Sequence, residues 1–89
     1  MNVLVVDAGG TNVKILATGQ TEPWSIVLTH TDAYWTNLGD GKVMKVPLGG
    51  GVATPVATVL LTGAWGLALD ATSIYWSDPP NGTIYRTSR

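Results

Sequence analysis

The residues with the most distinctive chemistry lie near the N-terminus, in the stretch VVDAGGTNVK at residues 5–14. Asp7 is followed by two glycines, a threonine and then a lysine. Glycines in a tight turn let backbone N–H groups approach a phosphate, because no Cβ stands in the way. The stretch is therefore a candidate phosphate-binding turn between two strands.

Metal chemistry has little support in the rest of the chain. His30 is the single histidine, it has no second ligand at metal-binding spacing, and the chain contains no cysteine. The residues Asp32, Asp40, Asp70 and Asp78 lie at expected turns and strand ends. Acceptance of local backbone N–H groups explains them more simply than a calcium site. We expect no metal and no cofactor.

Four tryptophans have two interpretations. Trp24, Trp35, Trp65 and Trp76 could form a platform on which carbohydrate rings stack. The interval from Trp24 to Trp65 is the same as that from Trp35 to Trp76. This repetition favours packing within or between repeated units.

Composition limits the possible partners and locations. The chain has 89 residues, of which 45% are apolar and 12% charged, with a net charge of −1. One small domain without a basic face is expected, so a nucleic-acid partner is not. With so few charges, we expect some apolar surface to be covered by another chain. Residues 47–69 carry no charge, but their glycines and Pro55 interrupt the stretch, so no membrane span is expected. The N-terminus lacks a basic segment, so no signal peptide is expected, and the location is unknown, with the cytoplasm as the default.

An internal repeat organises most of the sequence. Residues 24–46 align without gaps to residues 65–87, so the repeat offset is 65 − 24 = 41. Six of the 23 aligned pairs are identical, namely Trp24/Trp65, Leu28/Leu69, Thr31/Thr72, Tyr34/Tyr75, Trp35/Trp76 and Gly41/Gly82. The same offset carried backwards places residues 2–10 over residues 43–51. A unit of about 40 residues with several short strands is typical of a β-propeller blade.

Short antiparallel strands are predicted throughout. Asp40-Gly41 and Asn81-Gly82 favour two-residue hairpin turns, because both turn positions require positive φ. Alternating polar and apolar residues on either side predict half-buried strands. The expected strands are 2–7, 12–18, 25–29, 33–37, 42–47, 54–61, 66–70, 74–77 and 83–87.

The segments YWTN (34–37) and YWSD (75–78) resemble the YWTD repeats of six-bladed β-propellers. The resemblance covers roughly residues 19–89. It implies that the acidic residue of the motif, Asp78 here and an amide at Asn37, is mainly structural and ties neighbouring blades together. The residues expected to build the repeat are Trp24, Tyr34, Trp35, Asn37, Gly41, Trp65, Tyr75, Trp76, Asp78 and Gly82.

The N-terminal stretch, VLVVDAGGTNVKILATGQ, resembles the first hairpin of ROK-family sugar kinases, including glucokinase-like members. The resemblance implies that Gly9, Gly10 and Thr11 face a nucleotide phosphate, that Asp7 sits near its metal, and that Lys14 follows on the return strand. Phosphoryl transfer also needs a base for the attacking hydroxyl, a metal site and two positioned substrates. The likeness is confined to this stretch, and propeller-like repeats follow it. We therefore expect no enzymatic activity.

Together these features predict one all-β domain over residues 1–89. Residues 1–23 form a kinase-like hairpin, 24–64 the first repeat, and 65–89 a shorter second repeat. Two blades cannot close a propeller of about four to eight blades. We therefore expect self-association, with three copies making a six-bladed ring that acts as a non-enzymatic binding or scaffold module for carbohydrate or protein ligands. The alternatives are a monomeric β-sandwich, a phosphate- or nucleotide-binding remnant of a sugar kinase, and a recombined or engineered chain without a selected biochemical role.

Overall fold

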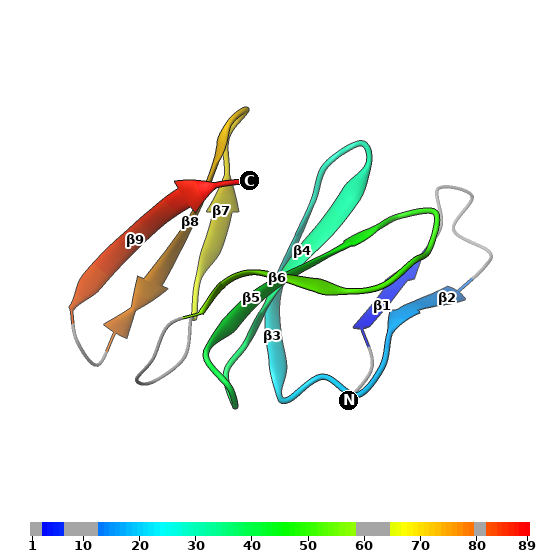
Figure 1. The fold of residues 1–89 in the computed structure, drawn as a ribbon. Helices are drawn as coiled ribbons and strands as arrows, with labels where there is room; N and C mark the ends of the chain where they lie inside the picture. The colour runs from blue at the N-terminus through cyan, green and yellow to red at the C-terminus, as the bar shows by residue number, and fades with distance from the viewer. Residues whose placement is uncertain (1–2, 7–12, 59–64, 80–81) are drawn as a thin grey trace.

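The structure is a computed structural model that describes residues 3–6, 13–58, 65–79 and 82–89, with side chains from residue 15 onward. It confirms the all-β prediction, since the described residues form antiparallel strands and no α-helix (Figure 1). The strands are β1 (Val3–Val6), β2 (Val13–Ala17), β3 (Pro23–Leu28), β4 (Asp32–Asn37), β5 (Lys42–Pro47), β6 (Thr54–Thr58), β7 (Leu67–Leu69), β8 (Ser73–Asp78) and β9 (Thr83–Ser88).

The strands make three antiparallel sheets. A hairpin of β1 and β2 lies on one side, the order β3-β4-β5-β6 forms a middle sheet, and β7-β8-β9 forms an outer sheet. The described strands close into neither a barrel nor a ring. The propeller arrangement therefore remains a prediction, whereas each expected strand has a counterpart in the described residues.

Strand positions recur at the repeat offset found in the sequence. Strand β8 begins and ends one repeat offset after β4, β9 does so after β5, and β6 does so after β2. The turns recur as well, because Gly41 has φ 68° and Gly82 has φ 63°. Glycine adopts this left-handed region without steric cost. The loop between β4 and β5 nevertheless has four residues, because Asn37 pairs with Lys42, and Asp40 does not adopt positive φ. The two-residue turn predicted at Asp40-Gly41 is therefore wrong.

The core lies on both faces of the middle sheet. Successive residues of a strand point to opposite faces, so the buried strand β4 contributes to both sides. One buried cluster joins the hairpin to the middle sheet and contains Leu16, Ala17, Ala33, Trp35, Met44 and Val46. The other joins the middle sheet to the outer sheet and contains Tyr34, Val43, Ile74 and Trp76. The middle sheet is thus packed between two neighbours.

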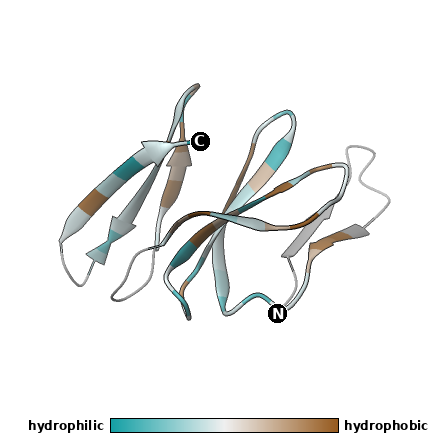
Figure 2. Ribbon diagram, in the orientation of Figure 1, coloured by the Kyte–Doolittle hydropathy of each residue, from teal (hydrophilic) through white to brown (hydrophobic). Residues whose placement is uncertain are grey.

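Hydrophobic residues also extend beyond these clusters. Figure 2 shows a hydrophobic segment within β9, the last strand of the outer sheet. Ile84 of this strand is 73% exposed. Part of the apolar surface built by the strands therefore has no cover within the described chain.

Candidate functional site

The predicted phosphate turn falls largely outside the described residues. Asp7, Gly9, Gly10 and Thr11 lie there, and Lys14 is described only through its backbone, which pairs with Val5. The two flanking segments do form an antiparallel pair, β1 with β2. Phosphate binding by this turn therefore stays a prediction.

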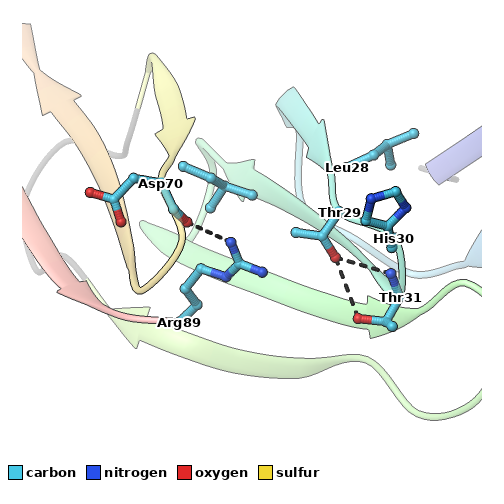
Figure 3. Close-up of a pocket in the computed structure, with 7 residues that line it drawn as sticks. Leu28, Thr29, His30, Thr31, Asp70 and Arg89 are labelled. Carbon is cyan, nitrogen blue, oxygen red and sulfur yellow. Dashed lines mark hydrogen bonds between the residues drawn. The ribbon is translucent and has the colours of Figure 1, made fainter.

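A pocket of about 580 Å³ lies between two repeat-equivalent turns (Figure 3). One turn follows β3 and the other follows β7, and the C-terminal Arg89 reaches the same space. The two turns are separated in the sequence by one repeat offset, and β3 approaches β7 in space. The lining residues are Leu28, Thr29, His30, Thr31, Leu69, Asp70 and Arg89.

The two turns use different side chains for the same task. Thr29 Oγ1 accepts the backbone N–H groups of Thr31 at 3.2 Å and Asp32 at 2.9 Å. Asp70 is the repeat equivalent of Thr29, and its carboxylate accepts those of Thr72 at 3.0 Å and Ser73 at 2.7 Å. Short polar side chains stabilise turns in this way by bonding to backbone groups two or three residues ahead. The replacement of threonine by aspartate between the repeats is therefore structurally conservative.

Hydrogen bonds hold Asp70 in its charged form. The Tyr75 hydroxyl donates to Asp70 Oδ2 at 2.7 Å, and together with the two turn N–H groups it lowers the pKa of this carboxyl from 3.8 to about 2. The Arg89 guanidinium donates to the backbone carbonyl of Asp70 rather than to its carboxylate. Since several donors already occupy the carboxylate, its chemistry is that of a fixed acceptor and not of a general base.

The pocket combines apolar and polar groups. Leu28 and Leu69 supply apolar wall, while His30 and Arg89 bring nitrogen donors to its rim. Such a mixture can hold a ligand by hydrogen bonds and apolar contact. Among the residues that the structure describes, no group of three or more potential metal ligands comes together.

The four tryptophans divide into a buried pair and an exposed pair. Trp35 is 1% exposed and Trp76 5%, as expected for packing. Trp24 and Trp65 are 63% and 39% exposed, and they meet edge to face with ring centres 5.5 Å apart. The Ser25 hydroxyl donates to the Trp65 carbonyl at 2.7 Å beside them. Through this exposed pair, β3 of the middle sheet contacts the segment that precedes β7 of the outer sheet.

The buried tryptophans differ in their hydrogen bonds. The indole N–H of Trp35 is directed at Asn37 Oδ1 at 3.1 Å and at Gln20 Oε1 at 3.3 Å. The indole of Trp76 stacks on Tyr85 with centres 5.5 Å apart, but its buried N–H has no hydrogen-bond partner among the described residues. The repeat equivalent of Gln20 is Leu61, a residue type whose side chain offers no acceptor. The sequence comparison between repeats identifies the loss of the Gln20 acceptor, but not the loss of the other one, because the equivalent of Asn37 is Asp78, which also carries side-chain oxygens.

The last residues of the YWTN and YWSD segments lie at the ends of buried strands. Asn37 and Asp78 end β4 and β8, and both are buried, at 1% and 0% exposure. Asn37 Nδ2 donates to Gln20 Oε1 at 2.9 Å, which ties the end of β4 to the segment before β3. The sequence did not single out Gln20, although its position before the first repeat tryptophan was visible.

Two apolar surfaces stay open at opposite ends of the sheet stack. On the outer sheet, the residues Ala68, Tyr75 and Ile84 share the face that points away from the middle sheet. On the middle sheet, Ile26 is 43% exposed and Leu28 52%, beside the part that the hairpin covers. The low charge of the sequence predicts apolar surface that another chain covers, but it does not place that surface on these residues. The alternation of polar and apolar residues along β3 and β9, combined with the repeat offset, could have located these two surfaces.

No helix long and apolar enough to cross a bilayer occurs in the described part of the chain. No protein-family model matches the sequence, and no curated protein matches it at significant similarity. The site geometry and the internal repeat therefore carry the functional interpretation.

Proposed function

We propose that the chain is a non-enzymatic binding or scaffold module that self-associates head to tail, with its sheets acting as blades of a β-propeller. The observation that carries the proposal is a difference in burial between equivalent residues. Val43 is fully buried at 0% exposure, whereas Ile84, its repeat equivalent on β9, is 73% exposed.

Both halves of one internal interface recur as open surfaces. Inside the chain, Val27, Tyr34 and Val43 of the middle sheet pack against an outer-sheet face that includes Leu67 and Leu69. Adding the repeat offset to the first set gives the open residues Ala68, Tyr75 and Ile84. Subtracting it from the second set gives the open residues Ile26 and Leu28. One copy can therefore repeat, on the next copy, the packing that it already contains.

An interface of this kind joins two different surfaces. Such head-to-tail contacts produce a ring if the rotation closes and an open filament if it does not. The likeness of YWTN and YWSD to the repeats of six-bladed propellers favours closure, with three copies in a ring. Closure also covers the apolar surface that a single copy leaves exposed.

In such a ring the pocket between the two turns acquires a functional position. Strands β3 and β7 approach each other more closely than the other strands of their sheets, which is the arrangement of innermost propeller strands. The pocket follows the ends of these strands, so it would open at the central mouth. Carbohydrate or protein ligands are the proposed classes, bound through His30, Arg89 and the apolar wall of the pocket.

Light scattering of the chain in solution tests the self-association. The wild type is expected to show a mass of several chains, and Ile84→Lys a mass closer to one. Burial of an isoleucine side chain contributes about 2 kcal/mol, which is roughly a 30-fold change in association constant.

The matched control is Val52→Lys. Val52 is 81% exposed but lies in the segment between β5 and β6, outside both open surfaces. This variant should keep the wild-type mass. A wild-type chain that is folded and monomeric at high concentration would exclude the proposal.

A further inference from the structure

The pocket between the turns after β3 and β7 combines side chains that recur in the repeat with side chains that do not. Leu28 and Leu69 are repeat equivalents, and both line the pocket. His30, in contrast, corresponds to Ala71 in the second repeat. The apolar wall therefore follows from the repeat, whereas the polar groups beside it are particular to this site.

Arg89 is the clearest departure from the repeat in this pocket. Its repeat equivalent is Leu48, whose backbone N–H donates to the Thr31 carbonyl at 2.9 Å. The Arg89 N–H donates in the same way to the carbonyl of Thr72, at 3.1 Å. The side chains differ, because Leu48 packs against the buried cluster of the hairpin and the middle sheet, while Arg89 lines the pocket. The backbone arrangement therefore does not require an arginine.

The Arg89 guanidinium is held in place and keeps free donors. Its Nη1 donates to the backbone carbonyl of Asp70, and Figure 3 shows the guanidinium between the two turns. A guanidinium has further N–H donors in a fixed fork, and none of them has a partner among the described residues. The Asp70 carboxylate points away from Arg89 in Figure 3 and accepts from Tyr75, Thr72 and Ser73. The free donors therefore face the pocket.

His30 adds a second donor on the turn across from Arg89 (Figure 3). An imidazole donates at least one N–H in either charge state. The side chain of His30 has no hydrogen-bond partner in the part of the chain that the structure describes. Donors from two turns beside the side chains of Leu28 and Leu69 suit an anion that is attached to an aliphatic group.

The chemistry of these groups narrows the ligand further. A guanidinium pairs with carboxylates and phosphates through two parallel hydrogen bonds. A single cation balances the single charge of a carboxylate better than the larger charge of a phosphate group. Among the described residues, no tryptophan, tyrosine or phenylalanine lines the pocket, so a sugar ring has no such aromatic face on which to stack. An aliphatic carboxylate therefore fits better than a sugar or a phosphate.

We propose that this pocket binds the C-terminal carboxylate of a peptide whose last residue is aliphatic. The carboxylate accepts hydrogen bonds from Arg89 and His30, and the last side chain of the peptide contacts Leu28 and Leu69. A C-terminal residue carries both groups on one Cα, so it presents them side by side. The inference rests on the proposed ligand site and narrows its ligand from carbohydrate or protein to the end of a peptide.

NMR titration of the isotope-labelled chain with N-acetyl-leucine tests the proposal through the backbone amides of the two turns. N-acetyl-leucinamide has the same side chain without the charge, and N-acetylglycine has the charge without the side chain. We expect N-acetyl-leucine to bind about tenfold more tightly than the amide, because one hydrogen bond to a charged group corresponds to about that factor. N-acetylglycine should also bind about tenfold more weakly, because it lacks the apolar contact.

Variants of two arginines separate a specific contact from general attraction of charge. Arg89→Gln should weaken the binding of N-acetyl-leucine about tenfold. The matched control is Arg86→Gln, which removes the same charge from β9. Arg86 does not line the pocket, and it lies with Ile84 on the face of β9 opposite to Tyr85. This control should bind as the wild type does, and circular dichroism checks the fold of both variants.

Several outcomes would overturn the peptide ligand. These are equal binding of N-acetyl-leucine and its amide, no shift of the two turns by either, and equal loss of binding in Arg89→Gln and Arg86→Gln. Glucuronate that binds more tightly than N-acetyl-leucine overturns it in favour of an acidic sugar.

Light scattering of the same samples keeps this inference apart from self-association. Monomers that bind N-acetyl-leucine through Arg89 support the peptide ligand and exclude the ring. Oligomers that do not bind it overturn the peptide ligand and leave the ring in place.

Discussion

At the scale of single residues, the two repeats provide a matched pair of buried tryptophans. Trp35 has acceptors in Asn37 and Gln20, whereas the N–H of Trp76 has none in the part of the chain that the structure describes. Trp35→Phe removes the donor from buried acceptors, while Trp76→Phe removes an unsatisfied donor. Leaving a buried polar group unpaired costs about 1–3 kcal/mol. We expect Trp35→Phe to lower the free energy of unfolding by about that much more than Trp76→Phe, in urea titrations at one protein concentration.

The loss of indole volume is common to both variants, so their difference isolates the hydrogen bonds. A second comparison strengthens this interpretation. In a Gln20→Leu background, which copies the residue found at position 61, part of the penalty of Trp35→Phe should disappear. Equal destabilisation by Trp35→Phe and Trp76→Phe would contradict the assignment.

Asp70 gives a prediction about acid stability. Hydrogen bonds from Tyr75, Thr72 and Ser73 lower the pKa of its carboxyl to about 2, from 3.8 in the unfolded chain. A lowered folded-state pKa means that the stabilisation is fully present above pH 3.8 and disappears as pH falls through about 2. Asp70→Asn keeps an oxygen acceptor but has no charge to titrate. Its unfolding free energy should therefore fall less steeply across this window than that of the wild type. If Asp70→Asn retained the full wild-type slope between pH 4 and 2, the bonds to Tyr75 and the turn would not be stabilising the charged form.

At the scale of elements, the turn between β4 and β5 lies against the segment that enters β3. Gly39 N–H donates to the Thr21 carbonyl at 3.1 Å, and Leu38 N–H donates to that of Glu22 at 3.0 Å. A Cβ on Gly39 would overlap the Thr21 methyl group and approach the Thr21 carbonyl to 3.1 Å. Gly39→Ala should therefore lower the free energy of unfolding by about 1–3 kcal/mol, measured by denaturant titration.

Two variants define the cause of that loss. Gly49→Ala is the control, because nothing lies within 4 Å of its added Cβ. It should be close to neutral. Thr21→Ser removes the methyl group that overlaps, so it should recover part of the stability of Gly39→Ala. Full destabilisation in the double variant would point to the backbone rather than to this contact.

The sequence predicts these elements well, because strands and hairpin turns are coded locally. Alternating apolar residues fix which face each side chain takes, and Gly41 and Gly82 mark where the turns lie. The turn type was not predicted correctly at Asp40-Gly41, where Asn37 pairs with Lys42 across a four-residue loop. Alternation does not say what covers a face, since Val43 and Ile84 follow the same pattern with opposite exposure. The pocket escaped prediction for a similar reason. It depends on two turns, at Thr29 and Asp70, that only tertiary packing brings together.

At the scale of the whole molecule, the three stacked sheets expose matching surfaces at their two ends. If these surfaces associate as proposed, the molecule is stabilised by its own concentration, because association removes folded chains from the unfolding equilibrium. A hundred-fold increase in concentration above the dissociation constant adds about 2.7 kcal/mol. For a domain of this size that corresponds to a rise in melting temperature of roughly 10–20 °C.

We therefore expect the melting temperature of the wild type to rise with protein concentration, and that of Ile84→Lys to stay nearly constant. Ile84 is 73% exposed, so its replacement removes the proposed intermolecular contact with little effect on the isolated fold. Differential scanning fluorimetry across a dilution series measures both curves. At the lowest concentration the two proteins should melt together, which distinguishes lost association from a damaged domain. A wild-type melting temperature independent of concentration would mean that the open faces of β3 and β9 do not meet in solution.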